Sequence, residues 1–334
     1  MDTPVRQIPI RQLISNMQGQ NDWFNGCMAY LMERLGEDAA YDYGFFSGVT
    51  GDSFTQVFSK DPGRMALCYS DSRPADAIQR AFEACGYGYD AFLAPPEGGW
   101  SALDERIRAY IDGNVPVIAR VKDRYHAFAI LCGYDGGGFY FVMGEDTVPK
   151  RCSYDALVFV TEKKGAPALA DVYRSAVMDI PHWLTLEGTA EYAFGKQAFS
   201  EWARSLEDGR YEGIADDDPR WHTHEDPDFT CWNMHGSYLC MLGTNACAIG
   251  FLEEALRLNP DMAFIQRLAT LYARQNLDGF ASLVQMEGGF RLPPKRIKNR
   301  SRMGPVSAKI RELAALCDDM LAVFAPVKED AGRS

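Results

Sequence analysis

The sequence predicts an α+β fold in the first half of the chain and a helical second half. Apolar residues recur at helical spacing before Val115, and short apolar runs separated by turn residues follow it. Long helical patterns return after about Ala166. Helices followed by a meander of strands are typical of an α+β unit. The length of 334 residues suits about two domains.

The helices of the first half are expected at 22–36, 76–85 and 103–113, each ending at or near a glycine. In the first of these, a glycine-containing loop at Asn25–Cys27 runs into the helix. The strands are expected at the apolar runs 115–121, 125–133, 139–143 and 156–161. Residues 135–138 (DGGG) predict a hairpin turn between the second and third strands.

The second half is predicted to hold helices at 189–206, 231–258, 261–275 and 306–324. The aromatic stripe of the first, from Tyr192 to Leu206, is interpreted as core. Nine acidic residues lie in 207–228, and six basic residues lie in 291–302. The basic run is interpreted as a solvated loop. It could also pair with the acidic loop, or dock an acidic partner such as a carrier protein or RNA.

The composition excludes several function classes. With 34 basic and 46 acidic residues the net charge is −12, so no basic footprint for general DNA binding is present. The hydrophobic fraction of 47% excludes a wholly disordered chain. We find no secretory signal, and no uncharged apolar stretch approaching the roughly 18 residues of a spanning helix. A cytoplasmic protein without a membrane partner is therefore expected.

The nine cysteines are scattered, odd in number and without a CxxC pair, which is typical of reduced cytoplasmic thiols. Cys27 differs because it lies at the expected start of a helix, where backbone N–H groups lower a thiol pKa. His126 is the only histidine in the first 181 residues and could act as its base. Asp146, after the next strand, could orient the imidazole, and the amide of Gln20 or Asn21 could stabilise an oxyanion.

Each of these residues also has an ordinary interpretation. Cys27 could be a buried thiol, His126 a core histidine and Asp146 a turn residue, and Glu145 or Asp135 could orient the imidazole instead. Three residues of a glycine-rich segment are candidates for lining a pocket, or for packing on the Cys27 helix: Ser47, Asp52 and Ser53.

One further group in the second half has metal-ligand residue types. Its members lie between Trp221 and His235: His222, His224, Asp226, Cys231 and His235. Their spacing matches no zinc module, so no metal and no cofactor is expected.

Two segments resemble a known superfamily. QGQNDWFNGCMAYLMERLG resembles the nucleophile region of the bacterial bacteriocin-processing (double-glycine) cysteine peptidases. NVPVIARV and YHAFAILCGYDGGGFYFVMGED resemble their histidine region, and YDYGFFSGVTGDSFTQVF is similar to a motif of butirosin-biosynthesis acyltransferase-like proteins. The resemblance covers about residues 15–162. It implies a papain-like thiol domain at 1–165, with the Cys on a helix and the His on an antiparallel sheet. A connection at 166–185 and an all-helical domain at 186–334 would follow.

The resemblance also implies a chemistry. Cys27 would be the nucleophile, His126 the general base and then acid, and Asp146 the group that fixes the imidazole. The enzyme would attack an amide or thioester carbonyl through an acyl-enzyme, which water or an amine resolves. A peptide or an acylated small molecule would be the substrate, with an acidic carrier protein as a further partner, and no oligomeric state is predicted.

The alternative is a catalytically inert papain-fold binding or regulatory protein. Two departures from the family pattern motivate it. Asn21 rather than Gln stands six residues before Cys27, and Met28 follows it.

Overall fold

The computed structural model describes residues 6–65, 68–122, 127–151, 153–165, 167–224, 226, 228–286 and 289–326. Internal contacts divide the chain into two compact units. The first contains residues 1–50 and 73–168, and the second contains residues 51–72 and 169–334. Residues 51–72 thus group with the second half of the chain. The expected boundaries at residues 165 and 186 stay a prediction.

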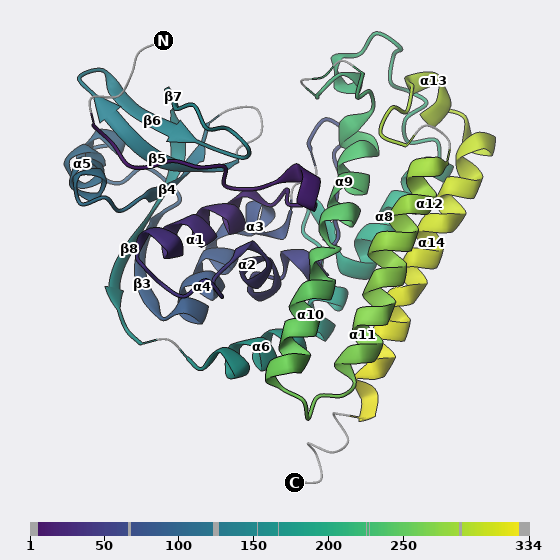
Figure 1. The fold of residues 1–334 in the computed structure, drawn as a ribbon. Helices are drawn as coiled ribbons and strands as arrows, with labels where there is room; N and C mark the ends of the chain where they lie inside the picture. The colour runs from purple at the N-terminus through teal and green to yellow at the C-terminus, as the bar shows by residue number, and fades with distance from the viewer. Residues whose placement is uncertain are drawn as a thin grey trace. The chain divides into compact units, whose positions relative to one another are not determined.

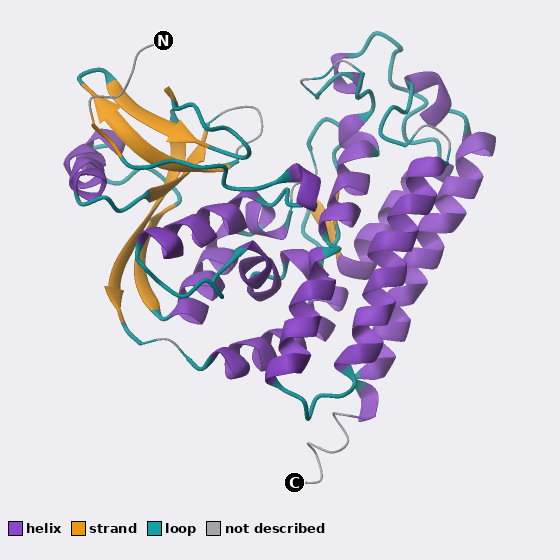
Figure 2. Cartoon of the chain, viewed as in Figure 1, coloured by secondary structure: helices purple, strands orange, loops and turns teal. Residues whose placement is uncertain are grey.

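An antiparallel sheet with helices forms the first unit, as an α+β fold requires (Figures 1 and 2). Its strands follow the order β3-β8-β4-β5-β6-β7, and β1 pairs with β5. The strands are β1 (Arg6–Gln7), β3 (Tyr87–Phe92), β4 (Val117–Val121), β5 (Phe128–Asp135), β6 (Gly138–Val142), β7 (Lys150–Arg151) and β8 (Tyr154–Lys163). The helices are η1 (Asn16–Gln18), α1 (Trp23–Arg34), α2 (Tyr43–Val49), α4 (Pro74–Cys85), η3 (Trp100–Leu103) and α5 (Asp104–Asp112).

The strand meander and two of the three helices agree with the sequence prediction. The predicted runs after Val115 are β4, β5 and β6, and Asp135 pairs with Gly138 across the expected hairpin turn. Helices α4 and α5 lie where the helical spacing placed them. Strand β3 had no prediction, because its residues are half exposed at the sheet edge and do not alternate in burial.

The predicted loop before Cys27 is wrong. Helix α1 begins at Trp23, so Asn25, Gly26 and Cys27 are inside the helix. A Cβ atom on Gly26 would lie 2.5 Å from the carbonyl oxygen of Leu13. The glycine therefore allows the N-terminal segment to cross closely over α1, and it does not interrupt the helix.

The second unit is mostly helical but contains one small sheet. Strand β2 (Val57–Ser59) pairs with β9 (Tyr192–Phe194) in antiparallel register. The expectation of an all-helical second domain is therefore wrong at Tyr192, which lies in β9 rather than in a helix. The short elements are η2 (Asp52–Phe54), α3 (Tyr69–Ser72), η4 (Pro219–Trp221), η5 (Trp232–Met234) and α13 (Pro294–Ile297).

The longer helices of the second unit depart from the predicted bounds. They are α6 (Leu169–Met178), α7 (Ile180–Thr185), α8 (Gly195–Glu207), α9 (Gly236–Thr244), α10 (Cys247–Leu258), α11 (Ile265–Tyr272), a π-helical segment (Ala273–Asp278), α12 (Gly279–Gln285) and α14 (Arg300–Val323). A turn at 245–246 divides the helix predicted at 231–258. Helix α14 begins earlier than predicted because the Asn299 side chain caps it, and Pro305 lies inside it.

One segment of the described chain, Gly236–Leu258, is long and apolar enough to cross a membrane, with a hydropathy of 1.3. The sequence analysis predicts no such segment, so this finding corrects it. Half of its most apolar window (50%) is buried inside the protein.

The charged loops of the second unit pair with each other. Lys298 contacts Asp216 at 2.6 Å and Arg300 contacts Glu212 at 2.7 Å. Arg291 lies 3.3 Å from Asp228. Of the interpretations open for the basic run, internal pairing is thus the one observed for these three side chains.

Candidate functional site

Cys27 lies in the second turn of α1 and is completely buried, with 0% exposure. Phe24 and Leu31 lie one turn away on the same side of the helix, and both are buried. The field of a helix N-terminus falls off within the first turn. Cys27 is beyond that turn, so the helix start does not distinguish it as the sequence predicts.

The side of α1 that bears Cys27 packs against the sheet. The rings of Phe24 and Phe128 have centroids 4.9 Å apart. Phe24 is three residues before Cys27, and Phe128 is the first residue of β5. The beginning of β5 therefore lies against the Cys27 side of α1.

His126 lies outside the described residues, as do its neighbours 123–125. In the sequence it stands two positions before Phe128.

Asp146 lies in a turn after β6, which ends at Val142. Its backbone N–H donates to the carbonyl of Met143, and its half-exposed carboxylate pairs with Lys150 at 2.6 Å. The β5–β6 register pairs Ile130 with Val142. The ladder ends there, because residues 143–146 form a turn.

The two alternative carboxylates have other partners. Glu145 accepts hydrogen bonds from the backbone N–H and the side-chain amide of Asn16, at 2.8 and 2.9 Å. Asp135 accepts from the backbone N–H of Gly137, which lowers the pKa of its carboxyl, and it pairs with Arg151. Asp135 also lies at the far end of β5. At the usual rise per residue of a strand it is about 24 Å from Phe128, which is too far to orient a side chain near the beginning of β5.

The two oxyanion candidates are held differently. The side-chain oxygen of Gln20 accepts from the backbone N–H of Ser15 at 2.8 Å, and its NH2 donates to Gln18 at 3.2 Å. The backbone N–H of Asn21 donates to the hydroxyl of Tyr43 at 3.2 Å. Tyr43 thus anchors the chain just before α1.

The three candidates for lining a pocket are buried. Ser47 lies in α2 of the first unit, whereas Asp52 and Ser53 lie in η2 of the second. Asp52 accepts a hydrogen bond from the backbone N–H of Ser70 at 2.8 Å. These residues do not line the pocket described next.

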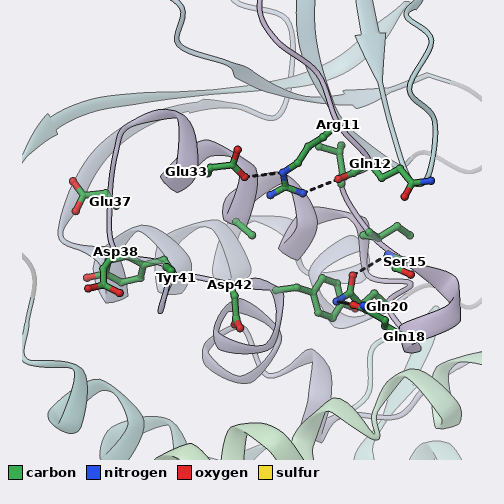
Figure 3. Close-up of a pocket in the computed structure, with 15 residues that line it drawn as sticks. Arg11, Gln12, Ser15, Gln18, Gln20, Glu33, Glu37, Asp38, Tyr41 and Asp42 are labelled. Carbon is green, nitrogen blue, oxygen red and sulfur yellow. Dashed lines mark hydrogen bonds and ion pairs between the residues drawn. The ribbon is translucent and has the colours of Figure 1, made fainter.

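A pocket that the sequence analysis did not predict lies in the first unit (Figure 3). From α1 it is lined by Ala29 and Glu33. Ala29 is two residues from Cys27, about 200° around the helix, so the pocket and Cys27 lie on opposite sides of α1. Gln20 also lines this pocket. The closely spaced acidic residues after α1 are the sequence signal that could have indicated it.

The group with metal-ligand residue types does not converge. His224 accepts from the backbone N–H of Asp226 at 3.0 Å, and buried His235 accepts from the indole N–H of Trp202 at 3.3 Å. Burial raises the pKa of the Cys231 thiol to about 12. Among the residues described, those between 222 and 235 bring no three ligand atoms together.

No protein-family model matches the sequence, and a comparison with curated proteins gives no match.

Proposed function

We propose that this protein is a cysteine-nucleophile enzyme with a papain-like catalytic unit, which attacks an amide or thioester carbonyl. The observation that carries the proposal is the packing of α1 on the beginning of β5 through Phe24 and Phe128. Phe24 is three residues before Cys27, and Phe128 is two residues after His126. The contact therefore lies close in sequence to both proposed catalytic residues.

In the proposed reaction the Cys27 sulfur bonds to the carbonyl carbon while His126 takes the thiol proton. The tetrahedral intermediate collapses, and the leaving amine or thiol departs with the proton that His126 returns. Water or an acceptor amine then attacks the acyl-enzyme and releases Cys27. Hydrolysis or acyl transfer results, depending on the acceptor.

Two supporting residues follow from the register and from the hydrogen bonds. We propose Asp146 as the group that orients His126, because its turn follows directly on the end of β6 that pairs with Ile130, near the beginning of β5. Asn21 is the better oxyanion candidate, because the Gln20 amide is held in the 15–20 turn and lines the pocket on the far side of α1.

A peptide or an acylated small molecule is the proposed substrate, and an acidic carrier protein is the proposed partner. The eight cysteines that the structure describes are all free thiols. Free thiols support the proposed cytoplasmic location, because a reducing compartment keeps them so.

Alkylation by iodoacetamide at pH 7, read peptide by peptide by mass spectrometry, tests the nucleophile. We expect Cys27 to be modified in the wild type, and about tenfold more slowly in His126→Ala, which lacks the base. The Cys27→Ser variant should lose only the modification at that position.

The other cysteines supply internal controls. Cys240 and Cys247 are half-buried, and each should react at the same rate in every variant as in the wild type. Burial raises the pKa of Cys85 and Cys132 to about 12, so these thiols stay protonated and should not react. An equal Cys27 rate in the wild type and His126→Ala would contradict the proposal.

The second candidate function is a papain-fold binding or regulatory protein with an inert thiol. The complete burial of Cys27 within the second turn of α1 favours it. In that case Cys27 stays unmodified in the folded wild type while Cys240 and Cys247 react.

A further inference from the structure

The pocket beside α1 has the dimensions of a small-molecule site. Its volume is about 480 Å³, within the roughly 300–1,000 Å³ typical of ligand pockets. Three segments of the first unit enclose it: the N-terminal segment 11–20, helix α1, and the connection 37–43 between α1 and α2 (Figure 3). These segments belong to one compact unit, so the pocket is a feature of that unit alone.

Apolar and aromatic side chains contribute part of the lining. Leu13, Ile14, Tyr41 and Tyr43 line the pocket and are buried, and Ala29 joins them from α1. Such side chains offer apolar surface to the body of a ligand and aromatic rings to a cation.

The remaining lining is strongly acidic. Glu33 is neutralised by Arg11 at 2.7 Å, and Glu37 by Lys163 at 2.5 Å. Asp38 and Asp42 are different, because their carboxylates accept from backbone N–H groups, those of Ala40 and Phe45, each at 2.8 Å. Within the described chain, no basic side chain pairs with Asp38 or Asp42. Two negative charges at the pocket thus lack a cation.

Tyr41 supplies an independent indication of a ligand. Its side chain lines the pocket and is 8% exposed. Its hydroxyl makes no hydrogen bond to any residue that the structure describes. The hydroxyl is not shut off inside the protein, so it is free to accept a hydrogen bond from a ligand in the pocket. Burial chiefly, and then the charges of Cys85, Glu37 and Asp38 in that order, raise the pKa of Tyr41, and Figure 3 shows the Asp38 and Tyr41 side chains next to each other.

We propose that this pocket binds a primary ammonium ion carried on a short apolar or aromatic body. The ammonium group would donate to the carboxylate of Asp38 and to the hydroxyl oxygen of Tyr41, which lie next to each other in Figure 3, while the separate carboxylate of Asp42 adds negative charge to the lining. The body would lie against Leu13 and Ile14. A neutral or anionic ligand of the same shape would leave the two aspartates uncompensated, so charge sets the selectivity.

This site is separate from the proposed thiol chemistry, because it lies on the opposite side of α1 from Cys27. Ligand binding and Cys27 alkylation are therefore independent measurements, and either proposal can fail without the other.

Titration of the full-length protein with 2-phenylethylammonium, followed by NMR or calorimetry, tests the proposal. In Asp38→Asn/Asp42→Asn the new side-chain oxygens can still accept from the backbone of Ala40 and Phe45, while both charges are removed. We expect the Kd to rise about fivefold or more in this variant, because the ammonium ion loses its attraction to two exposed carboxylates. The neutral analogue 2-phenylethanol should bind the wild type and this variant equally weakly.

The matched control is Glu97→Gln/Glu105→Gln, which removes two exposed charges outside the pocket. Its Kd should equal that of the wild type. If the Kd for 2-phenylethylammonium rose equally in both double variants, the overall net charge of −12 rather than the pocket would attract the ammonium ion. That result would overturn the proposal. Wild-type binding of 2-phenylethanol as tight as that of the ammonium ion would also overturn it.

Tyr41→Phe keeps the ring and removes only the hydroxyl, so it also tests the site if the double variant does not fold. We expect its Kd for 2-phenylethylammonium to rise about threefold for one lost hydrogen bond. An unchanged Kd would exclude the ammonium position proposed between Tyr41 and Asp38.

Discussion

Gly26 determines how closely the N-terminal segment can approach α1. A Cβ atom at this position would lie 2.5 Å from the Leu13 carbonyl oxygen and 2.6 Å from a methyl group of Ile14. Residues 13 and 14 in turn donate their backbone N–H groups to Gly144, in the turn that leads to Asp146. Gly26 thus supports the geometry that brings this turn to α1.

We expect Gly26→Ala to lower the free energy of unfolding by about 1–3 kcal/mol, because the new methyl group would overpack against a backbone carbonyl. Urea denaturation measures the change. Gly250 in α10 is the matched control, since a Cβ there meets nothing within 4 Å. Gly250→Ala should stabilise by about 0.5–1 kcal/mol. If both variants stabilised the protein, the close approach at Gly26 would be refuted.

His235 should make the protein less stable in mild acid. Burial lowers its pKa from 6.5 to about 4. Between these values the unfolded chain binds the proton and the folded chain does not, so stability falls as the pH falls through this window. The loss between pH 7 and pH 5 should be about 2 kcal/mol.

His235→Asn tests this dependence, because its side-chain oxygen can still accept from Trp202 but cannot take up a proton. Urea denaturation at pH 7 and pH 5 should show a smaller pH-dependent loss in this variant than in the wild type. An equal loss in both would assign the acid sensitivity to other groups.

At the scale of single elements, α2 depends on its N-cap. The Asp42 carboxylate accepts from the backbone N–H of Phe45 at 2.8 Å. We expect Asp42→Ala to destabilise the protein by about 1 kcal/mol, whereas Asp42→Asn should be nearly neutral. Thermal unfolding of the two variants measures the difference. An equal loss in both would assign the stabilisation to the charge of Asp42 rather than to capping.

The elements predicted best from the sequence are those with continuous apolar runs. The strands β4, β5 and β6 are fully or largely buried, and their runs of Val, Ile and Phe give a clear signal. Edge strand β3 and the three-residue strands β2 and β9 lack such a run. The prediction places the start of α1 too late, because it interprets Gly26 as a loop residue. In the structure a glycine is needed there because residues distant in sequence pack closely against this position of the helix.

The candidate site was predictable in part for the same reason. The prediction places Asp146 at the end of the strand that follows His126, and in the structure Asp146 lies in the turn after β6, whose last residue, Val142, pairs with Ile130 of β5. The pocket at Asp38, Tyr41 and Asp42 was not predicted, because a connection, a helix side and an N-terminal segment enclose it. Local patterns do not encode that arrangement.

At the scale of the whole molecule, the second unit is discontinuous in sequence. Residues 51–72 contribute β2, which pairs with β9, and Phe54, whose ring packs on Phe251 at 5.7 Å. A chain ending at residue 165 would carry these apolar groups without their partners. We expect that fragment to aggregate, and to become soluble when residues 169–334 are co-expressed. Soluble, monomeric 1–165 in size-exclusion chromatography would contradict this.

This discontinuity also has a consequence during synthesis on the ribosome. Strand β2 leaves the exit tunnel roughly 135 residues before β9, a delay of about 7–27 s at ordinary elongation rates. During that interval Phe54, Val57 and Phe58 lack the residues that later cover them. Nascent chains of this protein should therefore present a chaperone-binding segment at 54–58, which disappears only after the chain beyond Phe251 has emerged.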